Sequence, residues 1–135
     1  MMCYMAKKEN KQFPIVIKHE KFTRVNDSIV VQIKGGLWRY KRDGQKIEFS
    51  SRLGAVSYAV AYETMNNPGN IQRIDNTLGK HKNDAMFHKH HLKEAHKRRD
   101  EDAILLYQTR LELSMTGWDK ALTELKEISK AMNIV

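Results

Sequence analysis

Residues 71–113, IQRIDNTLGKHKNDAMFHKHHLKEAHKRRDEDAILLYQTRLEL, carry a heptad pattern that predicts one long helix. A repeat of 3.5 residues keeps one stripe of a helix facing a partner, as in a coiled coil. The stripe in this stretch is apolar at both ends and polar or small in the middle. Its members are Ile71, Ile74, Leu78, His81, Ala85, His88, Leu92, Ala95, Arg99, Asp102, Leu106, Thr109 and Leu113.

The sequence after this stretch predicts a second helix that folds back on the first. Residues 115–117, Met-Thr-Gly, are expected to break the long helix, and residues 118–133 repeat an apolar face suited to an antiparallel hairpin. At about 1.5 Å per residue, the long helix would span roughly 65 Å and the last helix only about 25 Å. The last helix would then cover residues 92–113 alone. Residues 71–91 would then pack on the sheet domain or on a second chain. We favour the second chain, which gives a homodimer or other homo-oligomer through 71–113.

Upstream of the long helix, short segments alternate β-branched or aromatic residues with polar ones, which is typical of half-buried strands. Tight-turn dipeptides stand between the later segments, at Asn26-Asp27, Gly35-Gly36 and Asp43-Gly44. The pattern predicts an antiparallel meander of three to four strands, with the first strand placed somewhere in 15–25. The extended segments are 15–18, 22–25, 29–34, 37–41 and 46–49.

A helix with a face of small residues follows the predicted meander. Ser50 or Ser51 is expected to cap it, and Asn67-Pro68-Gly69 to end it after about Asn66. Gly54 in its first turn would allow close approach to a strand. The sequence thus predicts an α+β fold, in which a small antiparallel sheet and one covering helix precede a coiled-coil-like helical hairpin. Its expected parts are a mobile tail at 1–13, the meander and helix at 14–67, and the hairpin at 71–135.

The composition favours a polyanionic partner. Lys and Arg number 24 against 16 Asp and Glu, a formal charge of +8, and neutralising phosphates supplies affinity without sequence specificity. The single cysteine, Cys3, excludes an intrachain disulfide and a zinc site built from several thiolates, and it fits a reducing compartment. No apolar run approaches the roughly 18 residues of a membrane span. We expect a cytoplasmic protein with no membrane contact.

Two groups of basic residues are candidate nucleic-acid contacts. On the long helix, Lys82, Lys89, Lys93 and Lys97, with His96, form a stripe that could follow a phosphate backbone, or simply a solvated flank of a coiled coil. Cations around the meander could enter a DNA groove while Trp38 and Tyr40 stack on bases, although these aromatics could equally pack under the helix. The sheet cations are Arg24, Lys34, Arg39, Lys41, Arg42 and Lys46.

Histidines are concentrated on the long helix, at positions 81, 88, 90, 91 and 96. His81, His88 and His91 share a helical face and are the candidate metal ligands, but their spacing matches no zinc motif. We favour a role in the seam, where His81 and His88 of two chains would repel each other when protonated and make assembly sensitive to acid. No phosphate loop or nucleophile elbow occurs, so we expect neither catalysis nor a cofactor.

Residues 35–62, GGLWRYKRDGQKIEFSSRLGAVSYAVAY, resemble the arm-site-binding domains of tyrosine integrases. In those domains a Trp-Arg strand, an Asp-Gly turn, a Phe-Ser/Thr corner and an alanine-rich helix recur. The resemblance implies that Arg39, Lys41 and Arg42 face the major groove of DNA. It covers a fifth of the chain, no integrase catalytic domain follows, and the long helix has no counterpart.

The layout of most of the chain is also similar to small uncharacterised proteins of tailed phages of marine bacteria, around WRYKRDG and EFSSRLGAVSYAVA. This resemblance implies a phage accessory role in the host cytoplasm, without an activity. Together these observations predict a non-catalytic accessory protein that binds nucleic acid or a nucleic-acid-handling complex. The alternative is a protein–protein adaptor or oligomerisation module that uses the helical hairpin, with incidental basic charge.

Overall fold

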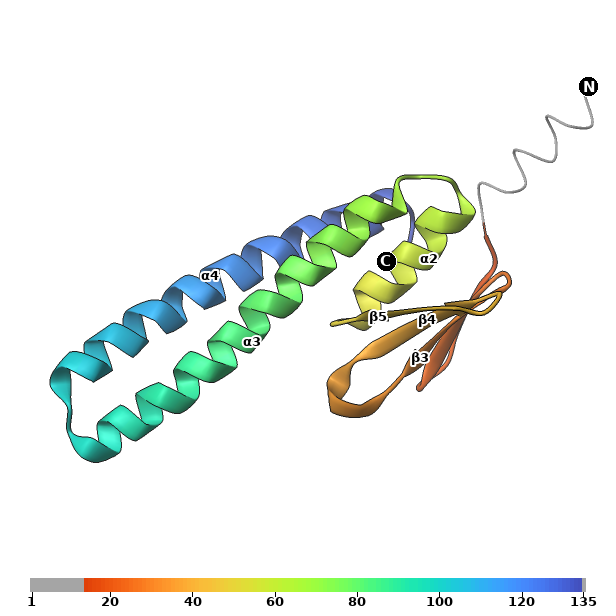
Figure 1. Cartoon of the computed structure of the whole chain (residues 1–135). Coiled ribbons are helices and arrows are strands. Elements are labelled where there is room, and N and C mark those ends of the chain that lie inside the picture. The colour runs from red at the N-terminus through yellow and green to blue at the C-terminus, as the bar shows by residue number, and fades with distance from the viewer. Residues whose placement is uncertain (1–13, 135) are drawn as a thin grey trace, which may run out of the picture.

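The computed structural model describes residues 14–134 and has an α+β architecture. A five-stranded sheet forms one layer, a single helix lies on it, and a long helical hairpin packs on the far side of that helix and extends well beyond the sheet (Figure 1). The three helices are α2 (Arg52–Glu63), α3 (Pro68–Arg98) and α4 (Glu101–Ala131). No helix within 14–134 is long and apolar enough to cross a membrane.

The sheet is an antiparallel meander in which each strand pairs with the next along the chain. All five extended segments of the sequence form strands, one more than the three to four predicted. β1 and β2 are separate because the backbone N–H of His19 donates to the carbonyl of Phe22 and closes a turn between them. The strands are β1 (Val16–Lys18), β2 (Phe22–Val25), β3 (Ser28–Gln32), β4 (Trp38–Arg42) and β5 (Gln45–Phe49).

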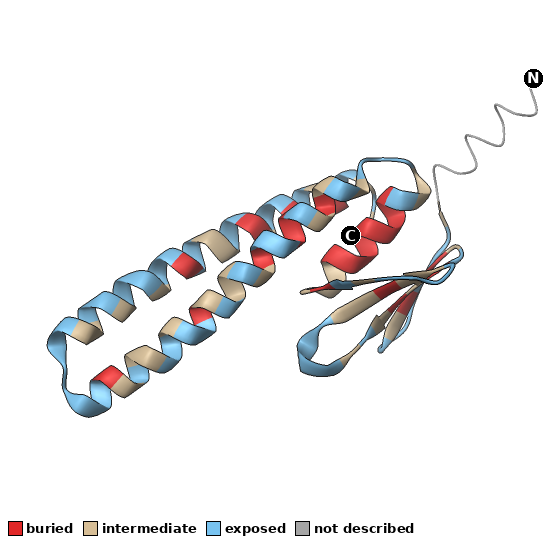
Figure 2. Ribbon diagram, viewed as in Figure 1, coloured by how far each residue is buried: buried red, intermediate tan, exposed pale blue. Residues whose placement is uncertain are grey.

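The main core lies between the sheet and α2. Val30, Tyr40 and Phe49 are buried on the sheet side, and α2 is buried from Gly54 to Ala61 because it is covered by the sheet on one side and by the hairpin on the other (Figure 2). Small side chains such as alanine and serine let both layers approach the helix closely. As predicted, Ser51 caps α2, its hydroxyl accepting from the backbone N–H of Gly54 at 3.0 Å.

The prediction of one unbroken helix from 71 to 113 is wrong, and so is the predicted break at 115–117. α3 ends at Arg98, Arg99 takes a left-handed conformation (φ 56°), and Asp100 caps α4 by accepting from the N–H of Ala103 at 3.1 Å. Charge explains the position: His96, Lys97 and Arg98 lie at the negative end of α3, and Glu101 and Asp102 at the positive end of α4.

Residues 115–117 continue α4, and Gly117 serves packing rather than termination. A Cβ atom there would lie 2.5 Å from Cε1 of His81 on α3, so the glycine makes room for the imidazole. Both hairpin helices have 31 residues and pack along their length. The difference in helix length that argued for a second chain along 71–91 therefore does not exist, and a homo-oligomer stays a prediction without that support.

The first half of the predicted stripe does face a partner, but the partner is α4 of the same chain. Ile71, Ile74, Leu78, Ala85 and Ala95 are buried in α3. The second half does not continue this seam, because the chain has reversed: Leu106, Thr109 and Leu113 are exposed on α4.

Asp75 ties the hairpin to the start of α2. Its buried carboxylate accepts from the backbone N–H of Ser50 and from the hydroxyl of Ser51, both at 2.8 Å. Burial raises the pKa of Asp75, and the hydrogen bonds from these two serines partly oppose the shift. A Cβ at Gly54 would lie 2.1 Å from Asp75 Oδ1, so this glycine permits close approach to α3 rather than to a strand.

Candidate nucleic-acid interface

One face of the sheet is covered by α2 and the other by no described element (Figure 1). Because side chains alternate along a strand, the register decides which residues share the uncovered face. A row runs across all five strands on this face, through pairs that lie directly opposite each other. Its members, in strand order, are Ile17, Arg24, Ile29, Lys41 and Lys46.

A second row on the same face carries Phe22, Val31, Arg39 and Glu48. Arg39 forms an ion pair with Glu48, with Nη2 and Oε2 3.0 Å apart. Arg24, Lys41 and Lys46 have no acidic side chain within 4.0 Å among residues 14–134. We call these two rows the open face. It presents cations separated by aliphatic side chains and carries a net positive charge.

Arg42 does not belong with Arg39 and Lys41, contrary to the predicted grouping. It lies on the α2 side of the sheet, where it forms an ion pair with Glu63 and its guanidinium carbon lies 5.3 Å from the centre of the Tyr62 ring. The reason is parity, because Arg42 is two residues from Tyr40 and adjacent to Lys41. The sequence already contained this signal, because the alternation of side chains along the strand places Arg42 with Trp38 and Tyr40 and not with Arg39 and Lys41.

The two aromatic residues of β4 also lie on the covered side. Tyr40 is buried, and its hydroxyl is hydrogen-bonded to Ser28 Oγ at 3.2 Å. Trp38 packs against Arg52, whose guanidinium carbon lies 4.8 Å from the ring centre. Of the two interpretations of these aromatics, packing under the helix is therefore the one that the structure supports. The open face offers no tryptophan or tyrosine for stacking on bases.

The second basic surface lies on α3, beyond the start of α2. Met86, Leu92, Lys89 and Lys93 line a groove of about 600 Å³ together with His90 and His96. We call this the basic groove. Of the other predicted stripe residues, Lys97 pairs with Glu94 at 3.5 Å, and Lys82 lies seven residues before Lys89, on the same side of the helix.

Heptad spacing shows that the basic groove lies on the side of α3 that faces α2. Asp75 contacts Ser50 and Ser51 at the start of α2, and Lys89 lies fourteen residues further along α3. Gly79, which also approaches Ser50, is followed at the same spacing by Lys93. Because α2 lies between the hairpin and the sheet, the basic groove and the open face point in the same direction.

The histidines do not form a metal cluster in the part of the chain that the structure describes. His81 lies against Gly117, while the rings of His88 and His91 lie 6.3 and 5.1 Å from the ring of Tyr107. Each is therefore opposed by a residue of α4. Acid-sensitive assembly through His81 and His88 stays a prediction. His88 Nδ1 is buried without a hydrogen-bond partner among the described residues.

Comparisons add no family: the chain matches no protein-family model, no curated protein and no solved structure.

Proposed function

We propose that this protein is a non-catalytic binder of duplex nucleic acid, with the open face as its principal contact surface. The observation that carries the proposal is the row of Arg24, Lys41 and Lys46, which the register aligns on a sheet face that nothing in the described structure covers. Cations at intervals on a firm β-surface suit contacts to successive phosphates. Sheets that carry such side chains are known to read duplex grooves.

The side-chain chemistry favours duplex over single strands. Non-specific binding of single strands relies on exposed aromatic rings that stack on bases. Trp38 and Tyr40 are packed toward α2, and Phe22, the aromatic residue of the open face, is half-buried against the ring of His19 at 4.3 Å. The open face thus supplies charge and aliphatic contact without a stacking platform.

The basic groove would extend the same surface. Because it points in the direction of the open face, one duplex that lies across the sheet could also approach the underside of the hairpin. The surface of the groove is mainly apolar, and Lys89 and Lys93 would add phosphate contacts through their ammonium groups.

Fluorescence anisotropy with labelled duplex and single-stranded DNA of equal length tests the proposal. We expect tighter binding of duplex, with a log–log salt slope of about −0.9 for each phosphate contacted. The variant Lys41→Glu with Lys46→Glu should weaken duplex binding at least about tenfold and lower the slope by about two contacts. Lys89→Glu with Lys93→Glu should give a smaller loss.

The matched control is Lys126→Glu with Lys130→Glu, which makes the same change in net charge at exposed positions on the base of α4. It should leave affinity nearly unchanged. Equal losses for the sheet and control pairs would show attraction to overall charge and reject the open face as the site. No binding at low salt would reject the function, and tighter binding of single strands would reject the duplex preference.

A second candidate, the adaptor function, is favoured by apolar side chains exposed on the hairpin, which include Phe87, Leu106 and Leu113. It predicts that substitutions at these positions abolish capture of a protein partner while the Lys41→Glu and Lys46→Glu variant retains it. A pull-down with each variant distinguishes the two functions. A phage accessory role and a cytoplasmic location are predictions that accompany either function.

A further inference from the structure

The hairpin beyond the start of α2, residues 80–117, has a poor core of its own. We call this part the distal hairpin. Its fully buried residues are the small Ala85, Ala95 and Ser114; Leu92, Ile104 and Leu111 are only half-buried, and six large apolar side chains are exposed. Two helices that bury so little between them gain little stability from burial, on which helices in proteins depend. The exposed large residues are Met86, Phe87, Leu105, Leu106, Leu113 and Met115.

Some of these residues share the side of the hairpin that faces away from α2. That side is marked at the base by a shallow cavity of about 220 Å³ between the helices, to which Thr77 and Lys120 contribute. Heptad steps lead from Thr77 to His91, and from Lys120 back to Leu113 and Leu106. His91 and these two leucines therefore lie on the same side, further toward the tip.

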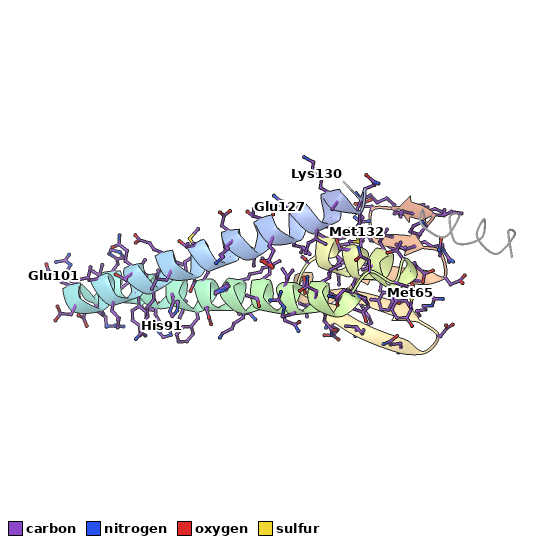
Figure 3. The ribbon with its side chains drawn as sticks, turned by 90° about the horizontal axis from the view of Figure 1, so that it is seen from above. Met65, His91, Glu101, Glu127, Lys130 and Met132 are labelled. Atoms are coloured by element: carbon purple, nitrogen blue, oxygen red, sulfur yellow. The ribbon has the colours of Figure 1, made fainter. Side chains whose placement is uncertain are left out.

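Aromatic contacts join the two helices at this point. The Phe87 and His91 rings are 4.3 Å apart, and the His91 ring stacks on Tyr107 of α4 at 5.1 Å. Figure 3 shows His91 well away from the sheet, toward the tip at Glu101. We call this set the outer patch; it comprises Phe87, His91, Leu106, Tyr107 and Leu113.

Charge identifies an occupant that suits this surface. On the outer side, Arg98 lies one heptad beyond His91 on α3, and Asp102 lies one turn before Leu106 on α4; both are exposed near the tip. Lys82, Lys89 and Lys93 lie on the side of the basic groove and do not face this surface. A second copy that is rotated about a two-fold axis parallel to the hairpin would set its α3 on the first copy's α4, and the reverse, so that unlike charges meet.

The same rotation makes the apolar groups complementary. Tyr107 stacks on His91, so Leu106 lies level with His91 along the hairpin, and Leu113 lies two turns nearer the base, close to the level of Phe87. Across the axis, Phe87 and His91 of each copy would meet Leu113 and Leu106 of the other. The sheets would project to opposite sides and would not collide, because each lies on the α2 side of its own hairpin.

We propose that the outer patch is the interface of a symmetric homodimer in which two distal hairpins lie parallel as a four-helix bundle. The interface is independent of the open face and the basic groove, which lie on the other side of the hairpin. Dimerisation buries the apolar side chains of the outer patch and supplies the distal hairpin with the core that it lacks.

Sedimentation velocity of the full chain, from about 1 to 100 µM, tests the proposal. The wild type should shift from monomer to dimer across this range, and Leu113→Lys should raise the dissociation constant at least about tenfold. Leu105→Lys is the control, because Leu105 and Leu113 are both 68% exposed in α4 but eight residues apart, about a quarter-turn around the helix. This control should dimerise like the wild type.

Circular dichroism of both variants is the control for folding. Unchanged helix content would show that a variant has lost dimerisation and has not unfolded. The proposal is overturned if the wild type stays monomeric throughout, or if both lysine variants weaken the dimer equally. The axis is tested in a Cys3→Ser background by mixing a Phe87→Cys chain with a Leu113→Cys chain. The mixture should form the disulfide-linked dimer, whereas dominant linkage of Phe87→Cys chains to one another would overturn the parallel arrangement.

Discussion

The two ends of the helical hairpin have the same heptad spacing but different side chains in the seam. At the base, α3 and α4 bury Ile71, Ile74, Leu78 and Leu125 against each other and α2. In the distal hairpin the fully buried residues are small, large seam residues such as Leu92 are only half-buried, and six other large apolar residues are exposed (Figure 2). The periodicity of a seam therefore indicates that two helices pack together, and the size of the seam residues determines how much that packing stabilises them.

The division between the two ends coincides with the start of α2. There Asp75 accepts hydrogen bonds from Ser50 and Ser51, and Gly79 lies close to Ser50. Beyond that point, no third element of the described structure packs against the two hairpin helices. The base should behave as the stable unit, and the distal hairpin as a surface for contacts. The following predictions test this difference, from the largest expected effect to the smallest.

Phe49→Ala, in the core between the sheet and α2, should destabilise the protein most. Phe49 is 1% exposed and packs against Tyr58, with ring centres 5.2 Å apart. Truncating a buried phenylalanine typically costs about 3–5 kcal/mol through lost burial and the cavity left behind. Urea denaturation followed by circular dichroism measures the loss. A cost below about 1 kcal/mol would contradict a core between α2 and the sheet.

Gly54→Ala and Gly117→Ala should have opposite effects. In the base, the new methyl group at 54 would collide with the buried, hydrogen-bonded carboxylate of Asp75, and we expect a loss of about 1–3 kcal/mol. In the distal hairpin, the new methyl group at 117 would contact the ring of His81, which is half-buried and can rotate away. Because alanine has the higher helix propensity, we expect this variant to be stabilised by up to about 1 kcal/mol. Thermal melts of the two variants, run side by side, measure the signs. A loss at 117 as large as at 54 would show that the distal hairpin is packed as rigidly as the base.

Asp75→Asn should change how stability depends on pH. Burial raises the pKa of Asp75 in the folded protein, so the folded state holds this proton more firmly than the unfolded chain, where the ordinary value is 3.8. The contribution of Asp75 is therefore fully present below that value and declines as pH rises through the raised folded pKa. The wild type should gain free energy of unfolding relative to Asp75→Asn as pH falls from about 7 to 4. Denaturation of both proteins across this range measures the difference, and a difference that grows with pH would refute the assignment.

Leu105→Ala should have the smallest effect, changing the free energy of unfolding by no more than about 0.5 kcal/mol, because this side chain is largely exposed and lies outside the outer patch. Urea denaturation measures the change.

Amide hydrogen exchange tests the same difference between the two ends of the hairpin at the level of the backbone. In dilute samples, the distal hairpin should exchange faster than α2 and the base of α3, since little apolar surface is buried there. Uniform protection along α3 would remove the distinction between the two ends.

The sequence predicted the candidate surface only in part. As helical spacing and strand alternation predict, Lys89 and Lys93 line one groove, and Arg39 and Lys41 share one face of the sheet; that they contact nucleic acid stays a prediction. The same alternation should have separated Arg42, which the Glu63 ion pair holds on the other side of the sheet. The row of Arg24, Lys41 and Lys46 depends on the pairing of β2 to β5, which is set by contacts between distant parts of the chain.

The sequence by itself determined the extended segments that form the strands, a cap of α2 at Ser50 or Ser51, the basic charge and the inner stripe from Ile71 to Ala95, because each depends on local periodicity or composition. Only the tertiary structure decided that the stripe meets the chain's own second helix. A heptad repeat continues in register through Arg99 and Asp100, so periodicity alone cannot distinguish a long straight helix from two that reverse there. The capping of α4 by Asp100 and the packing of α4 on α3 and α2 select the reversal.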